Sequence, residues 1–423
     1  MNKEKIMNIL GWIGGKLKFL RLTDPDRDDQ LDIEEESIQE AGGGSLRQRI
    51  AGSKRQALIR RGAVAVLILI IVLGFYLYNR YHTFYDYVVA KSYENEVSSG
   101  TQYLSAGKYI YRYNSDGISC VNRKNNLKWS ITYNMQAPMA DACGDTVVIA
   151  EQQGTQIYIV NKDGLVGNFQ TLLPIMKVRV SKQGVVAAVL REDDVTWVNL
   201  YEADGSSIAN DKTTVRESGY PVDIDLSPDG QRLAVSYLGV GGGVVTSDVV
   251  YYHFGSAGQN MENHVVSETI YQQITVPELY FLDNSQSVVV RDDGFSVYKG
   301  SDEPEEAVSV SFEQEILACF HDEDYIGFLF TSQDEDYAYR LELYNYNGRK
   351  KLSRNINTEY EKIRIQNGQI IMYSDRHIEV FTSYGTKRFS SDYEKSIEDI
   401  YYFSEFRKYL VITGDSFDKI RIS

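Results

Sequence analysis

The chain of 423 residues carries 44 Lys and Arg against 59 Asp and Glu, a net charge of −15, and it contains 32 Tyr but only 7 Pro. This length suits one large domain with smaller segments, and the abundant Tyr favours half-exposed strands. The charge is uneven, because residues 1–61 hold 12 basic against 10 acidic side chains and the remainder holds 32 against 49. An acidic main domain repels phosphates, so we expect no nucleic-acid partner.

Residues 1–22 predict a basic amphipathic helix, because apolar side chains recur at helical spacing among Lys and Arg. Such a helix suits the surface of an anionic membrane leaflet; the alternatives are docking on a partner protein and a partly disordered tail. Residues 23–60 are rich in Asp and Glu and contain three consecutive glycines at 42–44. They predict a disordered linker, with a regulatory docking tail as the alternative.

Residues 61–80 predict a transmembrane helix. The stretch GAVAVLILIIVLGFYLY, residues 62–78, is uncharged and mostly apolar, and it nearly spans a hydrocarbon core. A buried core helix is one alternative, and a signal peptide is another that the long preceding segment disfavours. The residues expected within the lipid are Gly62, Val66, Ile70, Leu73 and Leu77. Those expected at its two borders are Arg60, Arg61, Tyr76, Tyr78 and Arg80.

Basic residues crowd the N-terminal flank of this helix, at Lys54, Arg55, Arg60 and Arg61. The positive-inside rule then places the N-terminus in the cytoplasm and residues 84–423 outside the cell membrane. The chain has three cysteines, Cys120, Cys143 and Cys319, an odd number with no CxxC spacing. We interpret them as small core hydrophobes of a domain that does not rely on disulfides.

After residue 84 the sequence becomes a series of short alternating runs separated by turns. In DIDLSPDGQRLAVSYL, residues 223–238, apolar and polar side chains alternate on both sides of a turn, which predicts a β-hairpin. Similar turns recur, although at different places within each unit. Their predicted residues are Asp116, Gly117, Asp163, Gly164, Asp204, Gly205, Pro228, Asp229, Gly230, Asp293, Gly294, Asn347 and Gly348.

A unit of about 30 to 45 residues is near the period of a four-stranded propeller blade. The candidate blades are 101–133, 137–172, 175–213, 221–270, 276–312, 315–356, 361–390 and 396–423. The last lacks an outer strand, which residues 86–98 can supply. The fold class is therefore all-β, a seven- or eight-bladed β-propeller with eight favoured; an open sandwich or two smaller β domains is the alternative.

The segment SPDGQRLAVSYL resembles the repeat of TolB-like and WD40-like propellers. The segments APMADACGDTVVIAEQQGTQIYIVNKDG and LLPIMKVRVSKQGVVAAVLRED, together with SGYPVDIDLSPDGQRLAVSYL, resemble domain-of-unknown-function family 5711 over roughly residues 80–420. The resemblance implies a Firmicutes protein with a membrane anchor and an extracytoplasmic PQQ-like or WD40-like propeller. It implies no activity and no catalytic residues.

No constellation of catalytic or metal-binding residues is apparent. The five histidines lie far apart in sequence, no G-x-S-x-G occurs, and residues 239–243 form a Gly-rich stretch without the features of a phosphate loop. Acidic turns at 321–324 and 333–336 do not match a calcium loop. Three Trp are too few for a quinone pocket. We therefore expect no cofactor and no bound metal.

The leading hypothesis is a non-enzymatic binding or scaffold module of the bacterial cell envelope. An unknown protein or cell-wall polymer would bind one face of the propeller, because loops gather on its rims. The first alternative is a quinone-dependent or glycan-active enzyme using acidic residues near the ring axis, for which the candidates are Asp141, Asp223, Asp225 and Asp283. The second is a transmembrane sensor that relays propeller occupancy to the cytoplasmic tail.

Overall fold

The structure is a computed structural model that describes residues 45–95, 100–193, 195–214, 219–241, 243–357, 360–403 and 407–423. The chain divides into two compact units, Met1–Phe75 and Tyr76–Ser423. The predicted amphipathic helix at 1–22 lies outside the described residues, as does most of the predicted linker.

Helix α2 runs from Ser45 to Tyr81. Its segment Ile59–Tyr78 has a mean hydropathy of 2.2 and no buried residues, so among the described helices this one is long and apolar enough to cross a membrane. The five residues expected within the lipid lie in it; Val66, for example, is 58 % exposed. One prediction was wrong. Residues 45–60, assigned to a disordered linker, are helical, because Ala, Leu, Arg and Gln are strong helix formers that continue the apolar segment backward.

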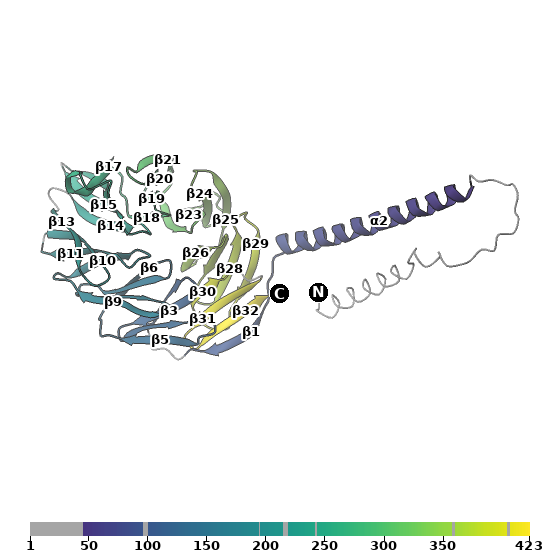
Figure 1. Cartoon of the computed structure of the whole chain (residues 1–423), viewed down its shortest axis with the longest axis horizontal. Coiled ribbons are helices and arrows are strands. Elements are labelled where there is room, and N and C mark those ends of the chain that lie inside the picture. The colour runs from purple at the N-terminus through teal and green to yellow at the C-terminus, as the bar shows by residue number, and fades with distance from the viewer. Residues whose placement is uncertain are drawn as a thin grey trace, which may run out of the picture. The chain divides into compact units, whose positions relative to one another are not determined.

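The second unit is built of antiparallel four-stranded sheets, which Figure 1 shows arranged in a ring. In seven of these sheets the strands follow one another in chain order from the centre outward. The first four blades are β2–β5 (Gln102–Ala106, Tyr109–Asn114, Gly117–Val121, Leu127–Thr132), β6–β9 (Pro138–Cys143, Thr146–Glu151, Gln156–Asn161, Gly164–Gln170), β10–β13 (Ile175–Val180, Val186–Glu192, Val195–Tyr201, Ser207–Thr214) and β14–β17 (Tyr220–Leu226, Arg232–Gly241, Val244–His253, Val265–Gln272).

The next three blades continue this pattern. They are β18–β21 (Glu278–Phe281, Gln286–Arg291, Gly294–Lys299, Glu305–Ser311), β22–β25 (Ile316–His321, Tyr325–Thr331, Tyr339–Asn345, Lys350–Ile356) and β26–β29 (Lys362–Gln366, Gln369–Tyr373, His377–Thr382, Lys387–Asp392). A short 3₁₀ helix, η2 (Glu262–His264), precedes β17.

The eighth blade joins the two ends of the propeller sequence. Strands β30 (Ile397–Tyr402), β31 (Lys408–Thr413) and β32 (Ser416–Ile422) are completed by β1 (Tyr87–Glu94), which pairs with β32 from Tyr87↔Ile422 to Glu94↔Ser416. The described residues thus form eight blades, so the favoured number is confirmed, and the outer strand expected from residues 86–98 is present. Closure in this way leaves no open end to the ring.

The core is divided into eight clusters, each lying between two consecutive blades. The cluster that joins the eighth blade to the first contains Leu410, Ile412 and Phe417 from one side and Ile110 and Val121 from the other. Second strands such as β7 are buried along almost their whole length, whereas outer strands such as β5 alternate between exposed and half-buried positions. Each blade therefore buries its faces only against its neighbours, which makes closure necessary for stability.

The predicted turn residues lie between strands or at the first residue of one. The best-defined turn is Pro228–Gly230 between β14 and β15. The Gly230 N–H donates to the Ser227 carbonyl (2.8 Å), and Gly230 has φ of +72°, which disfavours other residues. The Asp229 carboxylate accepts hydrogen bonds from the Ser227 hydroxyl (2.6 Å) and from Arg232 (2.8 Å). The turn is thus fixed by its own side chains.

Candidate binding site

The innermost strands of the propeller carry carboxylates that form hydrogen bonds with the backbone of the next blade. An innermost strand has one edge without a strand partner, so its backbone N–H groups need other acceptors. Side-chain oxygens supply three such acceptors across two blade boundaries. The bonds are Asp141 Oδ2 to the Val180 N–H (2.9 Å), Asp223 Oδ2 to the Leu279 N–H (2.9 Å) and Asp225 Oδ2 to the Phe281 N–H (2.6 Å).

Arg179 on β10 lies at the centre of these carboxylates. Its Nη2 is 3.2 Å from Asp223 Oδ1, and its Nε is 3.7 Å from Asp225 Oδ1. Lys177, two residues earlier on the same strand, places its Nζ 2.7 Å from Asp223 and also donates to the Val222 carbonyl (2.9 Å). Asp223 is only 1 % exposed, so this buried carboxylate is compensated by two cations and a backbone donor.

The cluster raises the pKa values of two of its carboxyls and of its guanidinium, for different physical reasons. Burial raises the pKa of Asp225 to about 7; the charge of Asp141 adds to this rise and Arg179 opposes it. Burial also raises the pKa of Asp141. For Arg179, burial acts to lower the pKa, but Asp141, Asp223 and Asp225 together outweigh it and raise the value. At neutral pH a carboxyl near half-protonation therefore lies beside a permanently charged guanidinium.

Glu278 on β18 and His321 on β22 extend the cluster into the next two blades. His321 Nε2 lies 3.4 Å from Glu278 Oε1, and the His321 ring stacks on Tyr280 with centroids 3.6 Å apart. Burial alone would raise the pKa of Glu278, but the hydrogen bond from His321 and the charges of His321 and Arg179 lower it below its ordinary value. Glu278 therefore stays ionised and keeps a negative charge at this end of the cluster.

A cleft of about 560 Å³ opens over this cluster between the third and sixth blades. It is lined by Lys177, Arg179, Asp223, Pro277, Glu278, Val290, Arg291, Asp292 and residues 315–319. Asp141 and Asp225 are not among the lining residues. The cleft therefore presents charges of both signs together with the partly exposed apolar side chain of Leu317, 45 % exposed. This combination suits a ligand with both polar and apolar groups.

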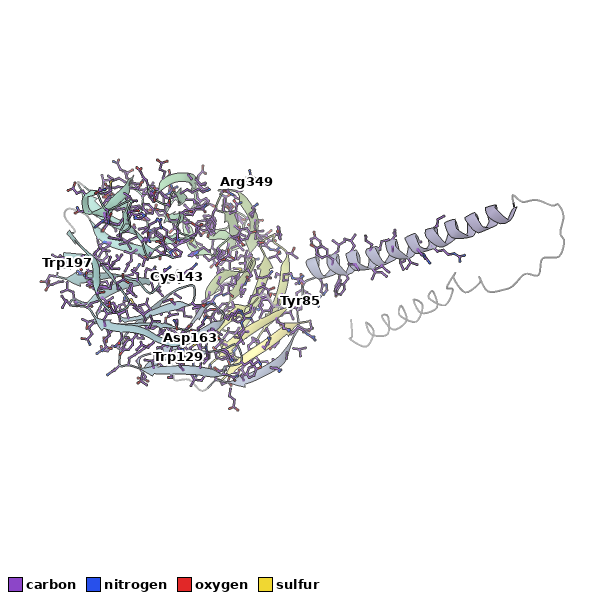
Figure 2. All side chains as sticks on the ribbon, in the orientation of Figure 1. Tyr85, Trp129, Cys143, Asp163, Trp197 and Arg349 are labelled. Atoms are coloured by element: carbon purple, nitrogen blue, oxygen red, sulfur yellow. The ribbon has the colours of Figure 1, made fainter. Side chains whose placement is uncertain are left out.

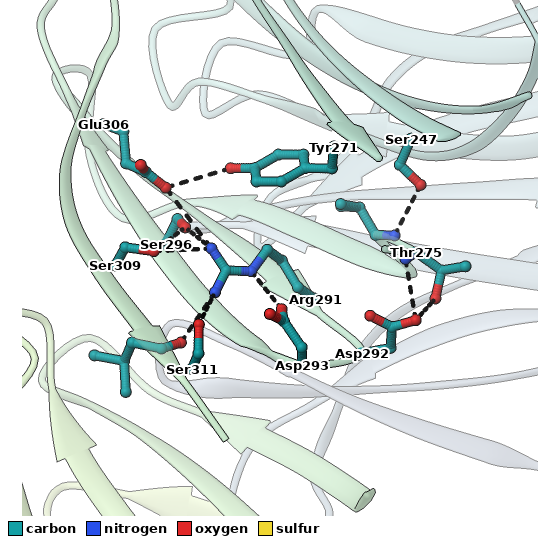
Figure 3. A network of polar contacts seen from close by, with 12 residues as sticks. Ser247, Tyr271, Thr275, Arg291, Asp292, Asp293, Ser296, Glu306, Ser309 and Ser311 are labelled. Atoms are coloured by element: carbon teal, nitrogen blue, oxygen red, sulfur yellow. Dashed lines mark hydrogen bonds and ion pairs between the residues drawn. The ribbon is translucent and has the colours of Figure 1, made fainter. Parts of the chain in front are cut away.

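One wall of the cleft is held rigidly by Arg291, whose contacts Figure 3 shows. Its guanidinium is 2.7 Å from Asp293 Oδ1 and donates to the hydroxyls of Ser296 (2.6 Å), Ser309 (2.9 Å) and Ser311 (2.9 Å). The neighbouring Asp292 accepts hydrogen bonds from the Thr275 hydroxyl (2.7 Å) and N–H (3.1 Å). These side chains are therefore preorganised before any ligand arrives.

Of the four carboxylates predicted near the axis, three come together. Asp141, Asp223 and Asp225 all lie around Arg179, whereas Asp283 caps a turn by accepting the N–H groups of Ser285 (2.6 Å) and Gln286 (2.9 Å). The basic partners and the lining residues of blades five and six were not among the residues predicted from the sequence. Two basic residues at alternate positions of an otherwise apolar strand, IMKVRV, are the signal that points to Lys177 and Arg179.

The cysteines pack as small apolar side chains. Cys120 is buried, Cys143 and Cys319 are half-buried, and all three are free thiols. Burial raises the pKa of the Cys143 thiol to about 11. Figure 2 shows Cys143 well inside the propeller, with Trp197 near its periphery. Within the described part of the chain, no three His, Cys, Asp or Glu side chains are grouped so as to hold a metal ion.

The family model described as "Family of unknown function (DUF5711)" matches residues 80–422, which include all eight blades. The chain belongs to DUF5711. The resemblance in the repeat segments is thereby confirmed, and the family match covers the complete propeller rather than one part of it. No curated protein matches the chain.

The DUF5711 propeller is similar to solved structures at very low identity. Sqt1 from Saccharomyces cerevisiae matches with a TM-score of 0.51 and 11 % identity, covering 82 % of this chain and 99 % of its own. BamB from Moraxella catarrhalis matches with a TM-score of 0.47 and 9 % identity, covering 80 % of this chain and 100 % of its own. At such identities the likeness shows a shared propeller fold only.

Proposed function

We propose that this DUF5711 chain is a non-enzymatic binding module, tethered to the bacterial cell membrane and displaying its propeller outside the cell. The partner, a protein or a cell-wall polymer, binds in the cleft over the Arg179 cluster. The observation that carries this proposal is the rigid arrangement of opposite charges around the cleft, from Lys177 and Arg179 to Glu278 and Arg291. Charges fixed in place favour specificity because they need little rearrangement on binding.

The cleft favours a partner of mixed charge. Three basic side chains line it against four acidic ones, so both signs are present in similar number; they are Lys177, Arg179 and Arg291 against Asp223, Glu278, Asp292 and Glu315. A strongly polyanionic ligand would meet the acidic side chains as well as the net negative charge of the propeller. A peptide segment or a zwitterionic polymer carries both signs and matches this lining.

The tether is supported by helix α2. Its segment Ile59–Tyr78 is mostly apolar and has no buried residue, and Arg60 and Arg61 lie near its N-terminal end. Basic flanks are retained in the cytoplasm, which supports a cytoplasmic N-terminus and an extracytoplasmic propeller. A cysteine placed at the exposed Leu127 of β5 should react with a membrane-impermeant maleimide in intact cells, whereas reaction only after lysis would contradict this orientation.

The experiment that tests cleft binding uses the intact chain, crosslinked in cells and purified with its partners. Leu317→Asp places a charge on the apolar part of the cleft, and we expect it to reduce recovery of the specific partner about tenfold or more. Glu313→Lys is the matched control, since this exposed residue lies four positions away and does not line the cleft. Equal loss in both variants, or in neither, would contradict binding at the cleft.

An enzyme is the second candidate, because Asp223 and Asp225 contact one guanidinium while their environments differ. Burial raises the pKa of Asp225 to about 7, and a raised carboxyl pKa is usual for a general acid. However, Asp225 does not line the cleft, and its Oδ2 accepts the Phe281 N–H. Because the Asp225 carboxylate is hydrogen-bonded within the protein and lies outside the cleft, a structural role is favoured for it. Turnover of a glycan or a quinone substrate by the purified chain, abolished in Asp223→Asn, would favour the enzyme instead.

A further inference from the structure

The first strand of several blades contains one extra residue at the same place, near its beginning. The pairing of β14 with β15 skips Val222, that of β22 with β23 skips Leu317, and that of β30 with β31 skips Glu398. Such a bulge residue has no partner on the second strand, so its backbone groups need hydrogen-bond partners elsewhere. Each bulge therefore depends on the neighbouring blade for these partners.

In two of these blades the partner is a lysine of the preceding blade. Lys177 of β10 donates from its Nζ to the Val222 carbonyl (2.9 Å), and Lys362 of β26 donates to the Glu398 carbonyl (3.0 Å). Lys177 also donates to the carboxylate of the residue after the bulge, Asp223 (2.7 Å). An ammonium group fits this place because its three donors can be shared between a carbonyl and a carboxylate.

At the sixth blade the lysine is missing. The fifth-blade side chain that reaches toward β22 is Glu278, whose Oε1 lies 3.4 Å from His321 Nε2. An ionised carboxylate only accepts hydrogen bonds, so Glu278 cannot serve the Leu317 carbonyl. Within the described residues no side chain donates to that carbonyl, and Leu317 lines the cleft. The cleft therefore opens at a bulge whose carbonyl has no lysine.

The charge that the cleft leaves uncompensated is negative. Its three basic side chains each pair with a carboxylate of the propeller. Glu315, in contrast, is exposed, and in the part of the chain that the structure describes its carboxylate has no hydrogen bond or ion pair. Glu278 pairs with a histidine, which is charged only when it is protonated. Two carboxylates therefore lie with the Leu317 carbonyl as acceptors for a cation from outside.

The side chain of Leu317 favours a lysine as the source of this cation. It is 45 % exposed beside these acceptors, and the four methylene groups of a lysine can pack along such an apolar surface. The two bulge carbonyls already filled within the chain both accept an amine rather than a guanidinium. The net negative charge of the propeller attracts any cationic partner as well.

We propose that the cleft binds a lysine side chain of a partner protein, with its ammonium group at the Leu317 carbonyl and the carboxylates of Glu278 and Glu315. This inference rests on the proposed function and names the group that the cleft recognises. The partner lysine would complete at the sixth blade the contact that Lys177 and Lys362 make within the chain.

The first test uses the purified full chain in detergent and two peptides as probes. Both have the sequence Ser-Gly-Ala-Lys-Ala-Gly-Ser with blocked ends, but in one the lysine is acetylated at Nε, which removes its charge. Binding is titrated by saturation-transfer NMR on the lysine methylene groups. We expect the charged peptide to bind about tenfold more tightly, because hydrogen bonds to charged groups contribute more. Equal binding of the two peptides would overturn the inference.

Variants locate the binding of the charged peptide. Glu315→Lys supplies an ammonium from the chain itself, and we expect it to weaken binding about tenfold. Glu313→Lys is the matched control, since it makes the same charge change at an exposed residue outside the cleft and should bind as the wild type does. Equal loss in both would show an effect of net charge alone and would overturn the inference.

Glu278→Gln tests the second carboxylate with little change of size, and it should weaken binding about tenfold as well. Thermal unfolding accompanies each variant. We expect Glu315→Lys to leave the Tm unchanged, because Glu315 has no polar partner among the described residues. Binding lost together with a lowered Tm in both variants would make the two carboxylates structural and would overturn the inference.

The proposed function and this inference fail in different ways. A photoreactive amino acid in place of Leu317 shows whether the cleft is occupied in living cells. A crosslinked product with a lysine-containing segment of a protein would support the inference. A protein product formed although the charged peptide does not bind, or a product whose added mass is a glycan, would overturn only the lysine contact. No product from position 317 would overturn the proposed function, and the inference with it.

Discussion

At the scale of single residues, the polar side chains of the inner strands join the blades. In the sequence DIDL, Asp223 and Asp225 lie on one side of β14, and both accept N–H groups from β18 in the next blade. The same two carboxylates contact Arg179 from the preceding blade. Three consecutive blades are therefore connected through two alternate residues of one strand, and the cleft is built on this connection.

Removing one of these carboxylates should destabilise the propeller. Asp223→Ala leaves the Leu279 N–H without its acceptor and Lys177 and Arg179 without their nearest counter-charge. Since Asp223 is buried but its basic partners are partly exposed, we expect a loss of about 2–4 kcal/mol. Chemical denaturation followed by intrinsic fluorescence measures it. Asp116→Ala, in an exposed turn, is the control and should change the free energy by no more than about 0.5 kcal/mol.

Asp225 should make stability depend on pH. Its folded-state pKa of about 7 lies above the value of about 4 expected in the unfolded chain, so between these values only the folded state holds the proton. The contribution of Asp225 to stability is therefore greatest below about pH 4, falls as pH rises to about 7 and is constant above it. Over this window the fall is about 2–4 kcal/mol.

Asp225→Asn isolates this effect. The amide can still accept the Phe281 N–H but does not titrate, so we expect the Tm of the variant relative to the wild type to rise between pH 5 and pH 8. The measurement is thermal unfolding across this range, with Asp116→Asn as the comparison. A constant difference between variant and wild type at all pH values would show that the Asp225 carboxyl does not change its charge in this window.

At the scale of elements, one strand has a special part in the fold. Strand β1 comes first in the propeller sequence but pairs with the last strand, β32, so it closes the ring. The preceding residues 83–86 are also attached, since the Thr83 hydroxyl donates to the Lys387 carbonyl (2.9 Å) and the Ser423 N–H donates to the Asp86 carbonyl (2.9 Å). Residues 83–94 therefore both attach the segment after helix α2 to the propeller and close the ring.

Among residues 83–86, Phe84 should be the position at which substitution costs the most stability. It packs in the core cluster of the seventh and eighth blades, so Phe84→Ala should cost about 3–5 kcal/mol and expose the connection to proteases. The neighbouring Tyr85→Ala provides a matched control, since Tyr85 is exposed and should change stability by less than about 0.5 kcal/mol. Limited proteolysis and Tm measure both variants. Equal resistance of the Phe84 variant and the wild type would show that residues 83–86 are not docked.

The sequence predicted strands better than it predicted sites. Alternation and turn residues locate the blades because hairpin strands are neighbours in sequence, and the missing outer strand of 396–423 predicts closure by 86–98. The cluster around Arg179 depends on contacts between β10, β14 and β18, whose register across blades no local pattern specifies. The pairing of Tyr87 with Ile422 joins residues more than 300 positions apart, and no local pattern specifies its register.

At the scale of the whole molecule, the propeller and helix α2 have different roles in the proposed function. The eight blades form a closed ring with a cleft of fixed charges, and the apolar segment Ile59–Tyr78 is long enough to cross a membrane. Under the proposed function, a rigid ring carried by a membrane helix would act as a scaffold, in which the location of binding matters as much as its strength.

The most direct test of this account is site-specific photocrosslinking in living cells. A photoreactive amino acid replaces Leu317, in the cleft, or Glu313, outside it, in the otherwise intact chain. Cleft binding predicts one discrete crosslinked product from position 317 that is absent from position 313 and is lost when Glu315→Lys is added. Crosslinks from position 313 alone, or products from position 317 that Glu315→Lys leaves unchanged, would contradict the cleft as the binding site.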